Sequence, residues 1–228
     1  MNLSFNDRGS LLFVVLAVLG TTTMIIGGSS TSQVWADVIE GTEGDDFLVG
    51  TEGDDDIRAF GGDDIIDSNG GNDLNIGDFV NTGSDDDIIN SGSGADHNSG
   101  DGVFDAGSGN DIIASGEGDD FNDGDSTFGD GSGDDIIASG EGDDFNSGDT
   151  VPSISGSPGS GNDIIASGEG DDLNSGSGGD NIIASGEGDD LNEAGEGADI
   201  FACGGGEDTV LGFNEAEGDI AAQDCENV

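Results

Sequence analysis

Single or paired apolar residues return every nine positions between Gly41 and Leu211, separated by short runs of glycine and acidic residues. The segment DIIASGEGDDFN occupies residues 111–122, recurs unchanged at 135–146 and returns at 163–174 with Leu in place of Phe. Each nonapeptide divides into a six-residue turn and a three-residue strand, which is too short to be stable unless it stacks on copies of itself. The pattern therefore predicts an all-β fold, a parallel β-roll or β-helix solenoid of about sixteen nonapeptide units.

Two units make one turn of such a roll, so that alternate units lie on two sides. We name side a the units that begin at residues 41, 59, 82, 106, 130, 158, 176 and 194, and side b the units that begin at 50, 68, 91, 115, 139, 167, 185 and 203. Extra residues at 77–81, 100–105, 124–129 and 148–157 each follow a side-b unit, which predicts insertions on one edge of the roll. Their apolar residues either form a satellite cluster over the roll or belong to mobile loops: Phe79, Val103, Phe104, Phe128, Val151 and Ile154.

Position 8 of the nonapeptide, the usual core position, differs between the two sides. It is Ile in most side-a units, but in side b it is Asn at 75, 98, 122, 146, 174 and 192. One solution is an internal ladder in which each Asn amide bonds its neighbours above and below. The other is a local shift that turns the position-7 residues inward instead: Leu74, Phe121, Phe145, Leu173 and Leu191.

Composition alone points away from a folded protein. The 228 residues include 52 acidic and two basic residues, a formal net charge of −50, and only 32% are apolar. Such a chain typically stays disordered, because it buries too little apolar surface to offset the entropy of folding. A disordered tail has no reason to keep Ile at fixed intervals, so the two observations agree if bound cations supply positive charge. The charge argues against nucleic acid or an anionic membrane surface as a partner.

Position 6 of nearly every unit is Asp, and stacking brings these side chains into columns. Carboxylates about 5 Å apart repel one another strongly unless a hard cation lies between them. Calcium fits such a site because it accepts roughly six to eight oxygen ligands, here carboxylates and turn carbonyls. The predicted ligands are Asp46, Asp55, Asp64, Asp73, Asp87, Asp96, Asp111, Asp120, Asp135, Asp144, Asp163, Asp172, Asn181, Asp190, Asp199 and Asp208.

The shared frame, with Gly at position 4, Asp at position 6 and apolar residues at 7 or 8, closely resembles the G-G-x-G-x-D-x-U-x repeat of RTX proteins. The resemblance covers nearly the whole chain after the first 36 residues, and it departs at positions 1 and 2, where Ser, Ala, Thr51 or Asn69 can replace Gly. It implies a calcium-binding parallel β-roll. Sixteen loops in two columns leave room for up to about 14 calcium ions between neighbours.

The ends of the chain differ from the repeats. Residues 1–36 contain the apolar run 11–26 and are predicted to be a secretory signal removed after Ala36, with an uncleaved membrane anchor as the alternative. The roll is expected over 37–202 and a C-terminal cap over 203–228. In a secreted chain the isolated pair Cys203 and Cys225 is most simply a disulfide, which here would pin the cap.

No constellation typical of an enzyme is found. His97 is the lone histidine and takes a position-7 slot that is Phe or Leu in sister units, which favours a packing residue over a catalytic one. Carboxylate pairs repeated sixteen times indicate architecture rather than an acid–base site.

We therefore expect a secreted or cell-surface calcium-binding protein with a structural, adhesive or ion-sequestering role, with cell-surface or matrix components as possible partners. The alternatives are a disordered acidic polymer that buffers cations or templates mineral, and a flat solenoid that binds ice or glycan.

The two columns are not expected to bind calcium equally. Every insertion precedes a side-a loop, whereas side-b loops follow their strands directly and keep the motif SGEGDD. One side-a loop also carries Asn181, whose amide oxygen ligates without adding charge. The sequence therefore predicts the stronger ladder on side b: Asp96, Asp120, Asp144, Asp172 and Asp190.

Overall fold

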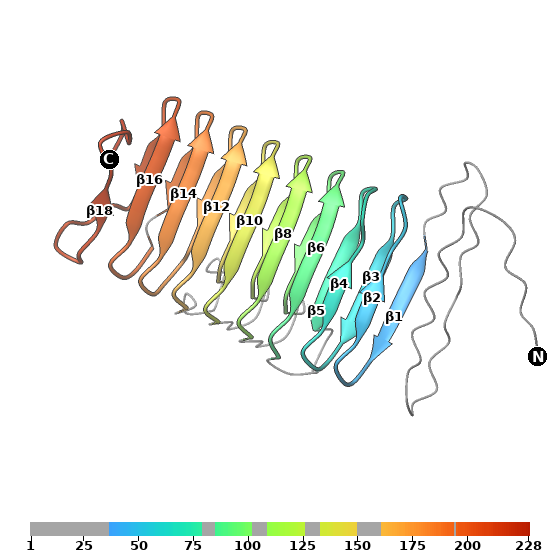
Figure 1. Cartoon of the computed structure of the whole chain (residues 1–228). Coiled ribbons are helices and arrows are strands. Elements are labelled where there is room, and N and C mark those ends of the chain that lie inside the picture. Colours follow the sequence, from blue (N-terminus) through green and yellow to red (C-terminus); the bar gives the residue numbers. More distant parts are fainter. Residues whose placement is uncertain (1–36, 79–84, 102–108, 126–132, 150–160, 194) are drawn as a thin grey trace, which may run out of the picture. The chain divides into compact units, whose positions relative to one another are not determined.

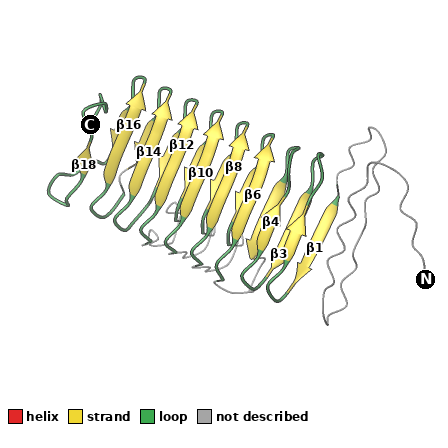
Figure 2. Ribbon diagram, in the orientation of Figure 1, coloured by secondary structure: helices red, strands yellow, loops and turns green. Residues whose placement is uncertain are grey.

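The computed structural model describes residues 37–228 except 79–84, 102–108, 126–132, 150–160 and 194. In this part the chain forms eighteen strands and no helix (Figures 1 and 2). The predicted signal segment and the apolar residues of the insertions (Phe79, Val103, Phe104, Phe128, Val151 and Ile154) lie outside the described residues.

The strands form two nine-stranded parallel sheets. The side-b sheet contains β1 (Val38–Thr42), β3 (Asp56–Phe60), β5 (Leu74–Asp78), β7 (His97–Ser99), β9 (Phe121–Asp123), β11 (Phe145–Ser147), β13 (Leu173–Ser175), β15 (Leu191–Glu193) and β17 (Thr209–Leu211). The side-a sheet contains β2 (Phe47–Val49), β4 (Ile65–Asp67), β6 (Ile88–Ser93), β8 (Ile112–Glu117), β10 (Ile136–Glu141), β12 (Ile164–Glu169), β14 (Ile182–Glu187), β16 (Ile200–Gly205) and β18 (Ile220–Ala221). Figure 1 shows the side-a strands following one another along the roll.

The predicted parallel β-roll is confirmed. Its sixteen units correspond one to one with β2 to β17, and β1 and β18 add one strand at each end. The insertions do not shift the pairing, since Ile112 pairs with Ile136 and Ile136 pairs with Ile164 although the two separations differ. The column of equivalent side chains is therefore continuous across insertions of different length.

The side-a strands are longer than the three residues that the pattern predicts. From β6 to β16 each has six residues and runs on into the first three residues of the next side-b loop. This continuation needs glycine, because Gly116 has a φ of 103° and a Cβ there would lie 1.9 Å from the carbonyl oxygen of Gly92. The side-b strands of the same region keep three residues.

The core is narrow and half polar. From the side-a sheet, one ladder of Ile points inward and is at most 1% exposed: Ile66, Ile89, Ile113, Ile137, Ile165 and Ile183. Opposite it, the side-b sheet contributes the six position-8 Asn residues, which are also at most 1% exposed. The inward Asn ladder is thus the arrangement that the structure adopts, and the position-7 residues do not turn inward.

Hydrogen bonds link the buried Asn amides along the ladder, although Asn75 Oδ1 at its first turn has no partner. Asn122 Nδ2 donates to Asn146 Oδ1 at 2.9 Å and to Ser115 Oγ at 3.0 Å, while Asn122 Oδ1 accepts from Asn98. The Ser115 hydroxyl in turn donates to the backbone carbonyl of Ser139 in the next turn. Since buried polar groups are costly unless paired, a continuous Asn–Ser network is what makes a polar interior tolerable.

The C-terminal segment closes the roll. The predicted disulfide between Cys203 and Cys225 is present, and it joins β16 to the tail. β18 pairs with β16, and Phe213 is a partly buried residue packed against the end of the core. The described part of the chain offers no helix with the length and apolarity required for a membrane span.

Candidate metal centre

The sixteen predicted ligands form two columns along the roll. The side-a column is Asp46, Asp64, Asp87, Asp111, Asp135, Asp163, Asn181 and Asp199, and the side-b column is Asp55, Asp73, Asp96, Asp120, Asp144, Asp172, Asp190 and Asp208. All except Asp46 are buried. Each lies at the end of its loop, directly before a strand, so the register of the sheets sets the columns.

One carboxylate oxygen of each column member has a structural role. The backbone N–H of Asp96 donates to Asp120 Oδ1 at 2.8 Å, and that of Asp120 donates to Asp144 Oδ1 at 2.9 Å. The same bond links successive turns on side a, as from Asp111 to Asp135 Oδ1 at 2.8 Å. The Oδ1 atoms therefore connect the loops to one another.

The second carboxylate oxygen, Oδ2, has no hydrogen-bond donor in most of these residues. In thirteen of the sixteen positions the Oδ2 atom is buried and has no hydrogen-bond partner. Asp46 and Asp55 are exceptions because Thr42 and Thr51 donate their backbone N–H groups to Oδ2, each at 2.6 Å. The third exception is Asn181. A buried carboxylate oxygen without a donor is costly, so these atoms fit a bound hard cation.

The electrostatics agree with this interpretation. Burial is the main cause that raises the pKa of Asp120 to about 6 and that of Asp172 to about 7 on side b, although backbone N–H donors lower both. On side a, burial and the neighbouring carboxylates raise the pKa of Asp87 to about 8 and that of Asp135 to about 9. Such carboxyls must take up protons or bind cations, and calcium offers the latter near neutral pH.

The structure also brings in acidic residues that the sequence analysis did not select. Asp101, Asp125 and Asp149 each lie two residues after a side-b strand, Asp78 is the last residue of β5, and all four are at most 2% exposed. Their signal in the sequence is a Gly-Asp pair that begins every insertion, at 77–78, 100–101, 124–125 and 148–149. In the tail, Asp219 and Glu226 extend the two columns by accepting the N–H groups of Asp199 and Asp208.

Three carboxylates lie close together: one from the side-a column and two from the Gly-Asp pairs of the insertions. Oxygen atoms of Asp101, Asp111 and Asp125 lie within 4.8 Å of one another, and all three residues are buried. Two unit charges at that distance repel by roughly 3.5 kcal/mol at an effective dielectric constant of about 20. Among the described residues, this is where three acidic groups converge closely enough to share one ion. This cluster lies beside the side-a column, and the predicted stronger calcium ladder on side b stays a prediction.

Other candidate residues lie on the surface. His97 is on the outer face of the side-b sheet, where its ring stacks on Phe121 with centroids 4.6 Å apart, and Phe121 stacks on Phe145 at 4.7 Å. The position-5 acids Asp119 and Asp143 are exposed, as expected for a solvated face. Asp143 donates its N–H to Asp119 Oδ1, so these side chains also bond neighbouring turns.

These features define a class of protein: a parallel β-roll whose stacked, glycine-rich loops present buried carboxylates to calcium. The protein-family model described as RTX calcium-binding nonapeptide repeat (4 copies) matches the sequence at residues 40–74, 77–97, 98–126, 159–191 and 175–210, which together are more than half of the chain. The chain belongs to this family and is a calcium-binding repeat protein. A comparison with curated proteins found no match.

Proposed function

We propose that this chain is a secreted structural protein that folds when it binds calcium in its extracellular surroundings. The observation that carries the proposal is the set of thirteen buried Oδ2 atoms without donors, in a chain of net charge −50. Without cations these carboxylates oppose the stacked state, and with calcium they are its ligands. Binding energy then appears as folding energy.

Calcium at the position-6 Asp residues supplies a positive charge that accepts several oxygens at once. The residues that would hold it are the two columns already described, with the glycine-rich turns contributing backbone carbonyls. The chain itself provides the scaffold: Oδ1 atoms link consecutive loops, Ile and Asn ladders fill the interior, and the disulfide holds the last turn. This division of labour leaves the Oδ2 atoms for the ions.

Secretion is supported by two features. The apolar run 11–26 is typical of a signal peptide, and a disulfide is stable in oxidising compartments. Extracellular calcium modules commonly bind at about 10⁻⁴–10⁻³ M, which suits sites of this kind. The role that we propose is structural or ion-sequestering, without enzymatic activity, because the carboxylate arrangement is repeated along the whole roll and His97 lies stacked on its surface.

The test is circular dichroism of the purified mature chain during a calcium titration. We expect a coil spectrum in chelator and a cooperative change to a β spectrum at about millimolar calcium. Sodium at equal ionic strength is the control for simple screening. A spectrum that does not change with calcium would refute the proposal and favour the disordered acidic polymer.

A pair of matched variants separates ligation from loss of charge. Replacing Asp96, Asp120 and Asp144 by Asn removes three buried column carboxylates, whereas the same change at Asp119, Asp143 and Asp171 removes three exposed ones. We expect the first set to raise the calcium midpoint and the second to leave it nearly unchanged. Equal midpoints for the two sets would contradict the assignment of position 6 as ligand.

A further inference from the structure

A second column of carboxylates runs beside the side-a ligands. Asp78, Asp101, Asp125 and Asp149 lie at or just after the ends of consecutive side-b strands. The backbone N–H groups of Asp78, Asp101 and Asp125 donate to the carbonyl of the glycine before the next member, at 2.8, 3.0 and 3.0 Å. The column is bounded by residues without charge. Phe60 pairs with Asp78 at one end, and at the other Ser177 donates its hydroxyl to the carbonyl of Asp149.

One oxygen of each of these Asp residues has an evident structural role. Asp125 Oδ2 accepts the N–H of Gly133 at 2.7 Å, and Asp149 Oδ2 accepts that of Gly161 at 2.9 Å. Asp101 Oδ2 accepts from Gly109 at 3.2 Å. In each case the bond fastens the side-a loop that follows the insertion.

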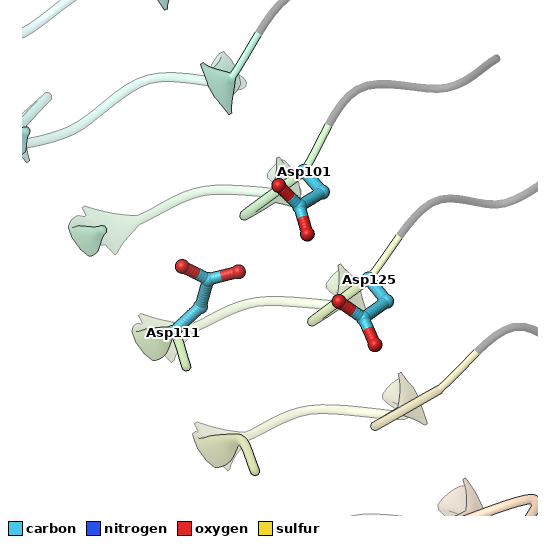
Figure 3. A group of neighbouring side chains, drawn as sticks. All are labelled: Asp101, Asp111 and Asp125. Atoms are coloured by element: carbon cyan, nitrogen blue, oxygen red, sulfur yellow. The ribbon is translucent and has the colours of Figure 1, made fainter. Parts of the chain in front are cut away.

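The second carboxylate oxygen of each of these Asp residues has no such structural role. The Oδ1 atoms of Asp78, Asp101, Asp125 and Asp149 are buried without a hydrogen-bond partner, and so are the Oδ2 atoms of the facing column members Asp87, Asp111, Asp135 and Asp163. Figure 3 shows Asp101 and Asp125 at equivalent places in consecutive turns, with the Asp111 carboxylate across from them. A Cβ on Gly100 would lie only 2.0 Å from Asp111 Oδ2, so the glycine of each Gly-Asp pair leaves room for that oxygen.

Side-a loops without this neighbour serve as an internal comparison. Asp64 and Asp199 do not follow a Gly-Asp insertion, and each has one buried Oδ2 atom without a hydrogen-bond partner. In loops that do follow one, the second-column Asp adds another buried oxygen without a partner, as Asp101 Oδ1 does near Asp111. The turn that has Ser177 in place of the second-column Asp also has Asn181 in place of the position-6 Asp, so both charges are absent from the same turn.

We infer that the second column forms additional divalent-cation sites with the side-a ligands, of which the site made by Asp101, Asp111 and Asp125 is the best defined. The ligands are hard oxygen atoms, so the ion is calcium, as in the proposed function on which this inference rests. Three carboxylates at one ion give these sites more charge than the side-b loops offer. The insertions thereby strengthen the column that they interrupt.

The experiment counts bound calcium in wild-type protein and in the double variant Asp101→Asn/Asp125→Asn. Asn keeps an oxygen to accept the N–H groups of Gly109 and Gly133 but removes the charge. The matched control is Asp119→Asn/Asp143→Asn, which removes two exposed charges. Equilibrium dialysis against calcium chloride with elemental analysis gives the ion number, and circular dichroism gives the calcium midpoint.

We expect the double variant to lose at least one ion per chain relative to the control, and its midpoint to rise by about threefold or more. Equal ion numbers and equal midpoints would overturn this inference while leaving the proposed function intact. Failure of the wild-type chain to bind calcium would instead overturn the proposed function. Should the double variant not reach a β spectrum, the single variants Asp78→Asn and Asp149→Asn at the ends of the column decide, and unchanged ion numbers there overturn the inference.

Discussion

The buried Asn ladder allows a quantitative test of what holds the roll together. In the variant Asn122→Ala, Asn98 loses the acceptor for its Nδ2–H and Asn146 Oδ1 loses its donor, both in bonds of 2.9 Å. The interior excludes water, since Asn98 and Asn122 are 0% exposed. Each unsatisfied buried group costs about 1–3 kcal/mol, so we expect a loss of about 4 kcal/mol in the free energy of unfolding.

Asn110 provides a matched control on the surface. Its amide also bonds two neighbouring turns, donating to Asp86 Oδ1 at 3.0 Å and accepting from the N–H of Asp134 at 2.9 Å, but it is exposed. Because water can replace these partners, Asn110→Ala is expected to lower the free energy of unfolding by less than about 1 kcal/mol.

The assay is urea unfolding followed by circular dichroism. Calcium must be held at the same saturating concentration for all variants, because bound ligand adds to apparent stability. If Asn122→Ala and Asn110→Ala differ by less than about 1 kcal/mol, the reasoning is wrong and the ladder contributes packing rather than hydrogen bonds.

Two further predictions concern glycine and pH. Gly116→Ala is expected to lower the free energy of unfolding by about 3 kcal/mol or more, because φ is 103° and the new Cβ meets the Gly92 carbonyl oxygen. Gly44→Ala is the control, because a Cβ there has no atom within 4 Å. Similar unfolding midpoints for the two variants would contradict this prediction. In calcium-free buffer, burial is the main cause that raises the pKa of Asp120 from 3.8 to about 6 and that of Asp135 to about 9. Their protonated state supports the fold fully below about pH 4, and this stability is lost as the pH rises through about 6 to 9. The calcium-free chain should therefore show more β structure by circular dichroism at pH 4 than at pH 9. Identical coil spectra at the two pH values would refute this prediction.

The sequence alone predicted the architecture of the described chain. A nine-residue period is a local property, and only a stack of identical turns keeps Ile and Asp at fixed intervals in a chain this acidic. The parallel β-roll, the sixteen units and the Cys203–Cys225 bridge were therefore accessible from spacing and residue type. The two columns of position-6 residues followed because parallel pairing places equivalent positions side by side.

Tertiary structure decided which way side chains face and which atoms are left without partners. The sequence left open whether the side-b Asn residues point inward, because that depends on bonds to residues 18 to 28 positions away, such as Asn75 to Asn98 or Asn146 to Asn174. The Gly-Asp pairs mark Asp101 and Asp125 in the sequence, but their role depends on where the strand ends place them relative to Asp111. That convergence depends on how the turns stack, whereas the predicted stronger calcium ladder on side b stays a prediction.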